Sequence, residues 1–129
     1  MRIFATLAAF VFFGSCTLCQ AQTSAPAGKT LYHVVSFKYK ETAKPEQIKE
    51  VDAAFAALKT KVPGITSLTW GTNVSPEKRN MGFTHCFILT FADDKDRDAY
   101  LTHPAHKEFG NVLRPVMADV FVIDFWAKE

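Results

Sequence analysis

The sequence predicts an α+β domain in which a β-α-β unit is followed by a second β-α-β unit, the ferredoxin-like order, and which pairs with a second copy. A chain of 129 residues accommodates one small domain. Strand-like and helix-like segments alternate in that order, and the strands carry large apolar side chains on both faces. A hydrophobic share of 48% excludes a disordered chain, and a net charge of +2 without basic runs gives no footprint for nucleic acid.

The first half of the domain is predicted to form a strand, a helix and a second strand. Residues 31–39 are rich in β-branched and aromatic side chains, which favours a strand. Pro45 suits the first position of a helix, and Pro63 with Gly64 ends it. Between them, apolar residues recur at helical spacing: Ile48, Val51, Phe55, Leu58 and Val62. Residues 65–73 form the second predicted strand.

The second half repeats this order with two helical segments. Residues 83–91 are strand-like, and Asp93 with Asp94 provides the acidic start that a helix favours. This helix is predicted to reach about Leu101, and a further helix to cover residues 104–117. Residues 119–126 form the last predicted strand.

The last and third strands do not alternate between apolar and polar residues. On the last strand Phe121, Ile123 and Phe125 share one face, while Val120 and Val122 share the other. Leaving each of the three larger side chains in water would forgo about 1.5–3 kcal/mol. We therefore expect a homodimer whose sheets pack face to face. The predicted interface comprises Phe121, Ile123, Phe125, Cys86 and Ile88.

The N-terminal segment resembles a secretory signal peptide. Arg2 supplies a positive charge, an apolar run covers residues 3–13, and Cys19-Gln20-Ala21 offers a small-x-small cleavage site. We expect residues 1–21 to be a signal peptide, residues 22–30 a flexible linker, and the mature protein secreted or periplasmic. Lipid attachment at Cys16, which would tie the protein to a membrane, and an N-terminal core helix are the alternatives. Cleavage leaves only Cys86, so no internal disulfide is expected.

Several motifs in this order are similar to a known family. They are Tyr32-His33-Val34-Val35, Trp70-Gly71, Gly82-Phe83-Thr84-His85, His103-Pro104-Ala105-His106 and Val122-Ile123-Asp124-Phe125. Together they resemble the stress-responsive A/B barrel (Dabb) domain family over residues 31–127. The resemblance implies a dimeric α/β barrel. No cofactor is expected.

The resemblance also implies candidate site residues. One enzymatic member of the family closes an aromatic polyketide ring by an aldol-type condensation. Its catalytic tyrosine and histidine fall on Tyr100 and His106, and two cavity histidines fall on His33 and His85. A cavity tyrosine of that enzyme falls on Phe55, so one polar group is missing here.

The histidines can also be interpreted without the family. His33 and His85 share strand parity with apolar residues, so both rings should point into the domain, where a buried imidazole needs hydrogen-bond partners. They are either core histidines that bond to the backbone or to each other, or polar groups of a small-molecule cavity. The predicted ligand-binding set is His33, His85, Phe55, Val35, Phe87 and His103.

Pro104 places His103 at the N-cap of a helix and His106 in its first turn. The positive helix end disfavours a charged imidazole there, so His106 should stay neutral near pH 7 and could act as a general base beside Tyr100. The alternative is that His103 only caps the helix and His106 only fixes the loop. His-x-x-His lacks a third ligand at metal spacing, so no metal site is expected.

Three classes of function follow from these observations. The first is an exported dimeric barrel that binds a small apolar or aromatic molecule in a histidine-lined pocket between sheet and helices. The second is a cyclase-like lyase that uses Tyr100 and His106 for proton transfer. The third is a purely structural assembly module.

Overall fold

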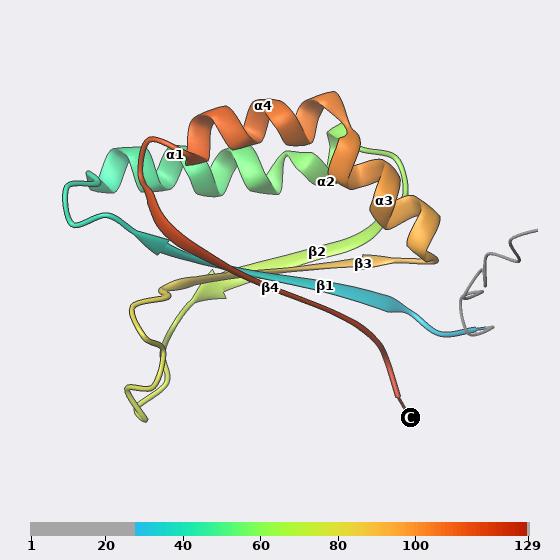
Figure 1. The fold of residues 1–129 in the computed structure, drawn as a ribbon, viewed down its shortest axis with the longest axis horizontal. Coiled ribbons are helices and arrows are strands. Elements are labelled where there is room, and N and C mark those ends of the chain that lie inside the picture. The colour runs from blue at the N-terminus through green and yellow to red at the C-terminus, as the bar shows by residue number, and fades with distance from the viewer. Residues whose placement is uncertain (1–27, 129) are drawn as a thin grey trace, which may run out of the picture.

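A computed structural model describes residues 28–128, which form a four-stranded antiparallel sheet with four helices on one side of it (Figure 1). The strand order across the sheet is β2-β3-β1-β4, so β1 pairs with both β3 and β4. This confirms the predicted ferredoxin-like α+β fold. The elements are β1 (Leu31–Tyr39), α1 (Pro45–Ala56), α2 (Leu58–Lys61), β2 (Ile65–Thr72), β3 (His85–Phe91), α3 (Asp94–Thr102), α4 (Pro104–Leu113) and β4 (Met117–Trp126).

The predicted signal peptide (1–21), Cys16 and most of the predicted linker (22–30) lie outside the described residues. Among the residues that are described, no helix has both the length and the apolar character needed to cross a membrane.

Two predicted helix boundaries differ from the structure. The helix predicted to run to Val62 is divided at Ala57, although the backbone there stays close to helical with φ −65° and ψ −19°. The apolar stripe therefore continues across the division, and Val51, Phe55 and Leu58 are all buried. Helix α4 ends at Leu113 rather than at residue 117. Pro115 explains this end, because proline lacks the N–H that a further helical turn needs.

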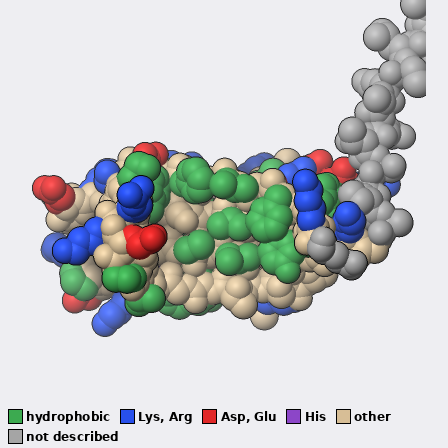
Figure 2. Space-filling view, turned by 90° about the horizontal axis from the view of Figure 1, so that it is seen from below, with side chains coloured by type: hydrophobic (Ala, Val, Ile, Leu, Met, Phe, Trp, Pro, Cys, Tyr) green, Lys and Arg blue, Asp and Glu red, His purple; other side chains and the backbone are tan. Residues whose placement is uncertain are grey.

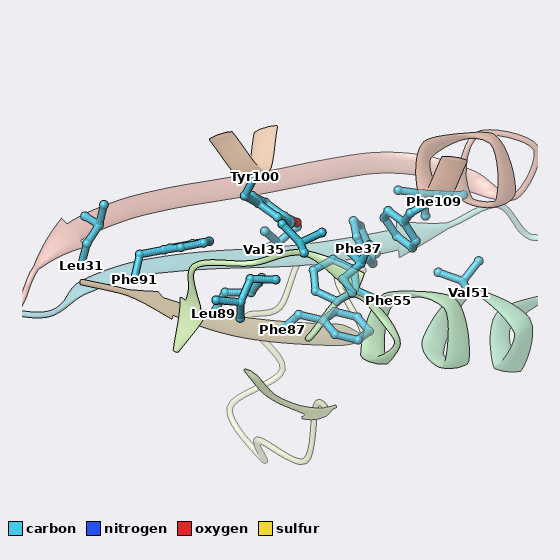
Figure 3. Packing of buried hydrophobic residues seen from close by; sticks show 14 of the residues in the cluster. Leu31, Val35, Phe37, Val51, Phe55, Phe87, Leu89, Phe91, Tyr100 and Phe109 are labelled. Atoms are coloured by element: carbon cyan, nitrogen blue, oxygen red, sulfur yellow. The ribbon is translucent and has the colours of Figure 1, made fainter. Parts of the chain in front are cut away.

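Aromatic rings from the sheet and the helices form the core (Figure 3). Phe37 on β1 and Phe87 on β3 face the helices, and their ring centroids are 5.5 Å apart. Phe55 from α1 stacks on Phe87 at 4.1 Å, and Phe109 from α4 meets Phe55 edge-on at 4.9 Å. Every one of these rings is at least 95% buried. The helices are thus attached to the sheet mainly through interlocking aromatic contacts.

The opposite face of the sheet carries an apolar surface that no element of the described chain covers (Figure 2). We call this surface the outer face. Phe121, Ile123 and Phe125 on β4 are 47%, 45% and 45% exposed. By strand register their neighbours on the same face include Tyr32, Val34, Cys86 and Ile88. The two-faced strands expected from the sequence are therefore present.

The helices cover the sheet unevenly. Val120 and Val122 point toward the helical side of β4, yet they are 41% and 49% exposed, as open as the residues on the outer face. In the strand order β4 lies at the edge of the sheet, and in the single chain most of its residues are exposed on both faces.

Candidate functional site

A chain of polar contacts crosses the helical side of the sheet at His33. This histidine is 4% exposed and lies opposite Asp124 in the pairing of β1 with β4. His33 Nδ1 lies 2.5 Å from Asp124 Oδ1, a short contact in which the ring N–H donates to the carboxylate. The other carboxylate oxygen, Oδ2, accepts a hydrogen bond from Arg97 on α3. We call these three residues the His33 cluster. Asp124 fixes the tautomer of His33 and leaves Nε2 as its free ring nitrogen.

Tyr100 packs directly against this cluster. It sits in the last part of α3, is fully buried, and presents its ring edge-on to His33 at a centroid distance of 5.6 Å. Burial, and after it the negative charge of Asp124, raises the pKa of the Tyr100 hydroxyl well above its usual value. The phenol therefore stays protonated throughout the physiological range and can act only as a neutral hydrogen-bonding group.

His106 completes the group from the first turn of α4. Its ring centroid is 4.5 Å from that of Tyr100, so the predicted catalytic pair is in contact. His106 Nδ1 lies 3.2 Å from the carbonyl oxygen of Leu101, to which it donates, and this leaves Nε2 with the lone pair. Burial, with a further contribution from His33, lowers the pKa of His106. The direction agrees with the expected neutral histidine, but the main cause is burial.

The other predicted site residues take different places. His103 is the N-cap of α4, where its Nδ1 accepts a hydrogen bond of 3.1 Å from the Ala105 amide. Val35, Phe55 and Phe87 are buried in the aromatic core. In this conformation they contact one another and the helices, and their part in ligand binding stays a prediction.

His85 belongs to a second group of polar side chains at the other end of the core. Its Nε2 lies 3.6 Å from Asp52 Oδ2 on α1, and its ring stands perpendicular to that of Tyr39 at 5.0 Å. We call these three residues the His85 cluster. Burial raises the pKa of the Asp52 carboxyl, an effect that His85 partly offsets, and burial together with Asp52 raises the pKa of Tyr39. Within residues 28–128, neither His33 nor His85 bonds to the backbone or to the other histidine, which differs from that expectation for core histidines. Their partners are side chains, and His85 Nδ1 also lies 2.9 Å from Thr84 Oγ1.

A pocket of about 560 Å³ opens on the outer face and under the β2–β3 loop. It does not lie between sheet and helices, where the sequence led us to expect a pocket, and of the predicted ligand-binding residues only His85 lines it. It shares Cys86, Ile88 and Phe121 with the predicted dimer interface. Its lining comprises Ser36, Thr69, Trp70, Gly71, Thr72, Asn73, Arg79, Asn80, Met81, Phe83, Thr84, His85, Cys86, Ile88 and Phe121.

Sequence reasoning missed the acidic partners of both histidines. Asp124 is one of two carboxylates, with Asp119, in an otherwise apolar last strand, and its parity with Val122 was a usable signal that it faces the helical side. Arg97 and Asp52 lie on helices among other charged residues, so they looked like solvated positions. Within residues 28–128, no three His, Cys, Asp or Glu side chains gather closely enough to hold a metal ion.

Comparison with known proteins places the chain in context. Residues 31–127 match the family described as Stress responsive A/B Barrel Domain. A stress-response A/B barrel domain-containing protein of Arabidopsis thaliana is 33% identical over 93 residues, which are 72% of this chain and 85% of that protein. Olivetolic acid cyclase of Cannabis sativa is 27% identical over 97 residues, which are 75% of this chain and 96% of the cyclase.

Solved structures show the same fold. A hydroxynitrile lyase from Passiflora edulis superposes with a TM-score of 0.73 at 27% identity, over 78% of this chain and 95% of the lyase. A dimeric ferredoxin-like protein of unknown function from Jannaschia sp. has a TM-score of 0.66 at 28% identity, over 74% of this chain and 97% of that protein.

The lowered pKa of His106 predicts a specific acid sensitivity. Below about pH 6.5 the unfolded chain binds a proton at this position while the folded chain does not, so the free energy of unfolding should fall as the pH drops toward the pKa of the folded state. NMR titration of the imidazole signals should give His106 a pKa below 6.5. His106→Gln should lose less stability than the wild type between pH 7 and pH 5. An equal loss in both proteins would contradict this assignment.

Proposed function

Because the chain belongs to the stress-responsive A/B barrel domain family over residues 31–127, we propose that it is an exported homodimer that binds a small apolar or aromatic carbonyl compound beside Tyr100 and His106 and transfers a proton on it. The observation that carries this proposal is the contact between Tyr100 and His106, whose ring centroids are 4.5 Å apart. Beside this pair lies the buried His33, whose Nδ1 is 2.5 Å from Asp124 Oδ1. Two relatives at 27% identity are named as a cyclase and a lyase.

The protonation states support the assignment of roles. His106 is neutral at pH 7 because its pKa is lowered, so its Nε2 is available as a base. Tyr100 keeps its proton because its pKa is raised, so it can donate a hydrogen bond. A weakly basic imidazole beside a neutral donor is the combination that abstraction of a proton next to a carbonyl group needs.

The proposed step is a single proton transfer. His106 Nε2 takes a proton from the carbon beside the carbonyl; the C–H bond breaks, an N–H bond forms, and the electron pair moves through carbon onto the carbonyl oxygen. The Tyr100 hydroxyl donates to that oxygen as its negative charge develops. The resulting enolate carbon can attack a second carbonyl carbon of the same molecule, so that a C–C bond forms and the π electron pair of that carbonyl moves onto its oxygen. Imidazolium His106 then gives its proton to this alkoxide oxygen, which restores the neutral imidazole. His33, oriented by Asp124 and Arg97, packs edge-on against the ring of Tyr100.

Binding without chemistry is a second candidate. Phe55 stacks on Phe87 at 4.1 Å and brings no polar group to the space between sheet and helices. A compound bound there would contact mainly aromatic side chains and few polar groups that could orient it. Such a site suits a protein that binds the compound without reacting with it. If no compound can enter the core, the protein is a purely structural assembly module.

The homodimer follows from the outer face. Three large side chains of β4 are nearly half exposed there, and burying each would contribute about 1.5–3 kcal/mol. The pocket under the β2–β3 loop opens on the same face, so a second copy that packs its sheet on this one would cover both. The solved dimeric ferredoxin-like protein at 28% identity supports this assembly.

Export rests on residues 1–21, and it would place the mature chain in the periplasm or outside the cell. Lipid attachment at Cys16 is the alternative.

Exchange of carbon-bound hydrogen tests the proposed proton transfer. With acetophenone as the probe in D₂O, the wild-type protein should accelerate deuterium uptake into the methyl group, as followed by NMR. Tyr100→Phe and His106→Gln should each reduce this acceleration by about 100-fold, because each removes one partner of the acid–base pair.

Tyr32→Phe is the matched control, since Tyr32 lies on the outer face and stacks on Phe125. It should leave the exchange rate unchanged. Size-exclusion chromatography of His106→Gln separates function from architecture, because a variant that dissociates or unfolds would assign His106 a structural role. Equal exchange in all four proteins would overturn the proposed mechanism.

A charge on the outer face tests the homodimer. Phe121→Asp should convert the protein from a dimer to a monomer at micromolar concentration, because it places a carboxylate in the packed sheet-to-sheet contact. Analytical ultracentrifugation measures the change. Val74→Asp introduces the same charge at a loop residue that is 91% exposed, and it should stay dimeric. A Phe121→Asp protein that remains dimeric would refute this interface.

Intact mass spectrometry tests export. Expressed in a bacterium, the protein recovered from the periplasm should lack residues 1–21 and begin at Gln22. A mass that corresponds to a lipid-modified chain starting at Cys16 would establish the alternative. A full-length chain retained in the cytoplasm would exclude both.

A further inference from the structure

The pocket on the outer face takes no part in the proposed proton transfer, yet it is large enough to hold a small molecule. Its volume of about 560 Å³ falls within the range of roughly 300–1,000 Å³ that is usual for ligand sites. One wall is the sheet, with Ile88 on β3 and Phe121 on β4, and another is the β2–β3 loop, residues 73–84. This loop extends below the sheet, on the side away from the helices (Figure 1). The chain itself therefore bounds the pocket on two sides.

Contacts within the loop hold it in the shape that forms the pocket. Asn80 Nδ2 donates to the carbonyl oxygen of Phe83 at 2.9 Å, and the Phe83 amide donates to the carbonyl oxygen of Asn80 at 2.7 Å. Gly82 has a left-handed φ of 87°, and a Cβ atom there would lie only 2.8 Å from Cε of Lys38, so glycine lets the loop pack closely on the sheet. The pocket is thus formed before a ligand binds, as is usual for small-molecule sites.

The apolar side chains of the pocket suit a ligand with an apolar body. The ring centroids of Phe83 on the loop and Phe121 on β4 are 6.1 Å apart, so both walls contribute an aromatic ring. Met81 and Ile88 also line the pocket. Met81 is 76% exposed in the single chain, and a ligand packed against it would remove apolar surface from water.

Arg79 gives the pocket a positive charge. It is the only Lys, Arg, Asp or Glu side chain among the lining residues. It forms no ion pair with any other residue in the range 28–128. A guanidinium group pairs with a carboxylate through two parallel hydrogen bonds. The charge of the pocket therefore favours a carboxylate over an amine.

We propose that this pocket binds a small aromatic carboxylate, whose carboxylate pairs with Arg79 and whose ring packs against Phe83 and Phe121. The pocket lies on the opposite side of the sheet from Tyr100 and His106, so this inference does not depend on the proposed proton transfer. In the proposed homodimer, a second copy would cover the mouth of the pocket. The β2–β3 loop would remain its own wall, so the ligand would lie at the margin of the contact between the two copies.

An NMR titration of the full chain tests this site with two matched probes, naphthalene-2-carboxylate and naphthalene-2-carboxamide. The carboxylate should shift the amide signals of Asn80, Phe83 and Ile88 in a saturable way, and it should leave those of Tyr100 and His106 unchanged. The carboxamide has the same shape without the charge. It should bind about tenfold more weakly, because it cannot form the charge-assisted hydrogen bonds to the guanidinium group.

Two loop variants complete the experiment. Arg79→Gln should weaken binding of the carboxylate about tenfold and leave binding of the carboxamide unchanged. Lys78→Gln is the matched control, since it removes the same charge from the adjacent residue, which does not line the pocket. It should leave the affinity for both probes unchanged.

Three outcomes would overturn the proposal. They are equal affinity for the two probes, equal weakening by the two variants, and absence of saturable shifts at the pocket. Analytical ultracentrifugation of the same samples reports the homodimer separately, so failure of this site and failure of the homodimer can be distinguished. In a protein that is dimeric but shows no saturable shifts, side chains of the second copy would fill the pocket instead.

Discussion

A single layer of helices on a sheet with two apolar faces is the constraint on which this structure depends. The helices bury β1 and β3 through stacked aromatic rings, of which Phe55 on Phe87 at 4.1 Å is the tightest. They leave the outer face of the sheet and both faces of β4 open. One layer of four short helices cannot cover both faces of the sheet. The apolar side chains that stay exposed therefore favour association with a second copy.

The same arrangement concentrates the polar chemistry of the domain at two points of its aromatic core. Because β1 is paired with β4, His33 faces Asp124 directly, and α3 brings Arg97 and Tyr100 to the same place. At the far end of the core, α1 brings Asp52 to His85. Each histidine therefore has a carboxylate partner from a different element, and burial then sets the protonation state of the neighbouring groups.

The two clusters differ in how completely they are satisfied. In the His33 cluster both oxygens of Asp124 have partners, which suits a rigid, preorganised group. In the His85 cluster, one oxygen of Asp52 and the Tyr39 hydroxyl have no hydrogen-bond partner among residues 28–128.

The order of the elements and the face that each strand residue occupies could be predicted from the residues, and the family resemblance implied the pairing of Tyr100 with His106. These depend on local periodicity and on a short loop around Pro104, which neighbouring residues fully encode. The partners of His33 and His85, the position of the pocket and the exposure of Val120 and Val122 could not be assigned without the three-dimensional arrangement of the strands and helices. Asp124 is 91 residues from His33, and Asp52 is on a helix rich in charges, so pairing of strands and packing of helices had to be known before either contact could be assigned. The local sequence pattern predicts the face on which a side chain lies. The packing of the sheet and the helices determines which residues that side chain contacts.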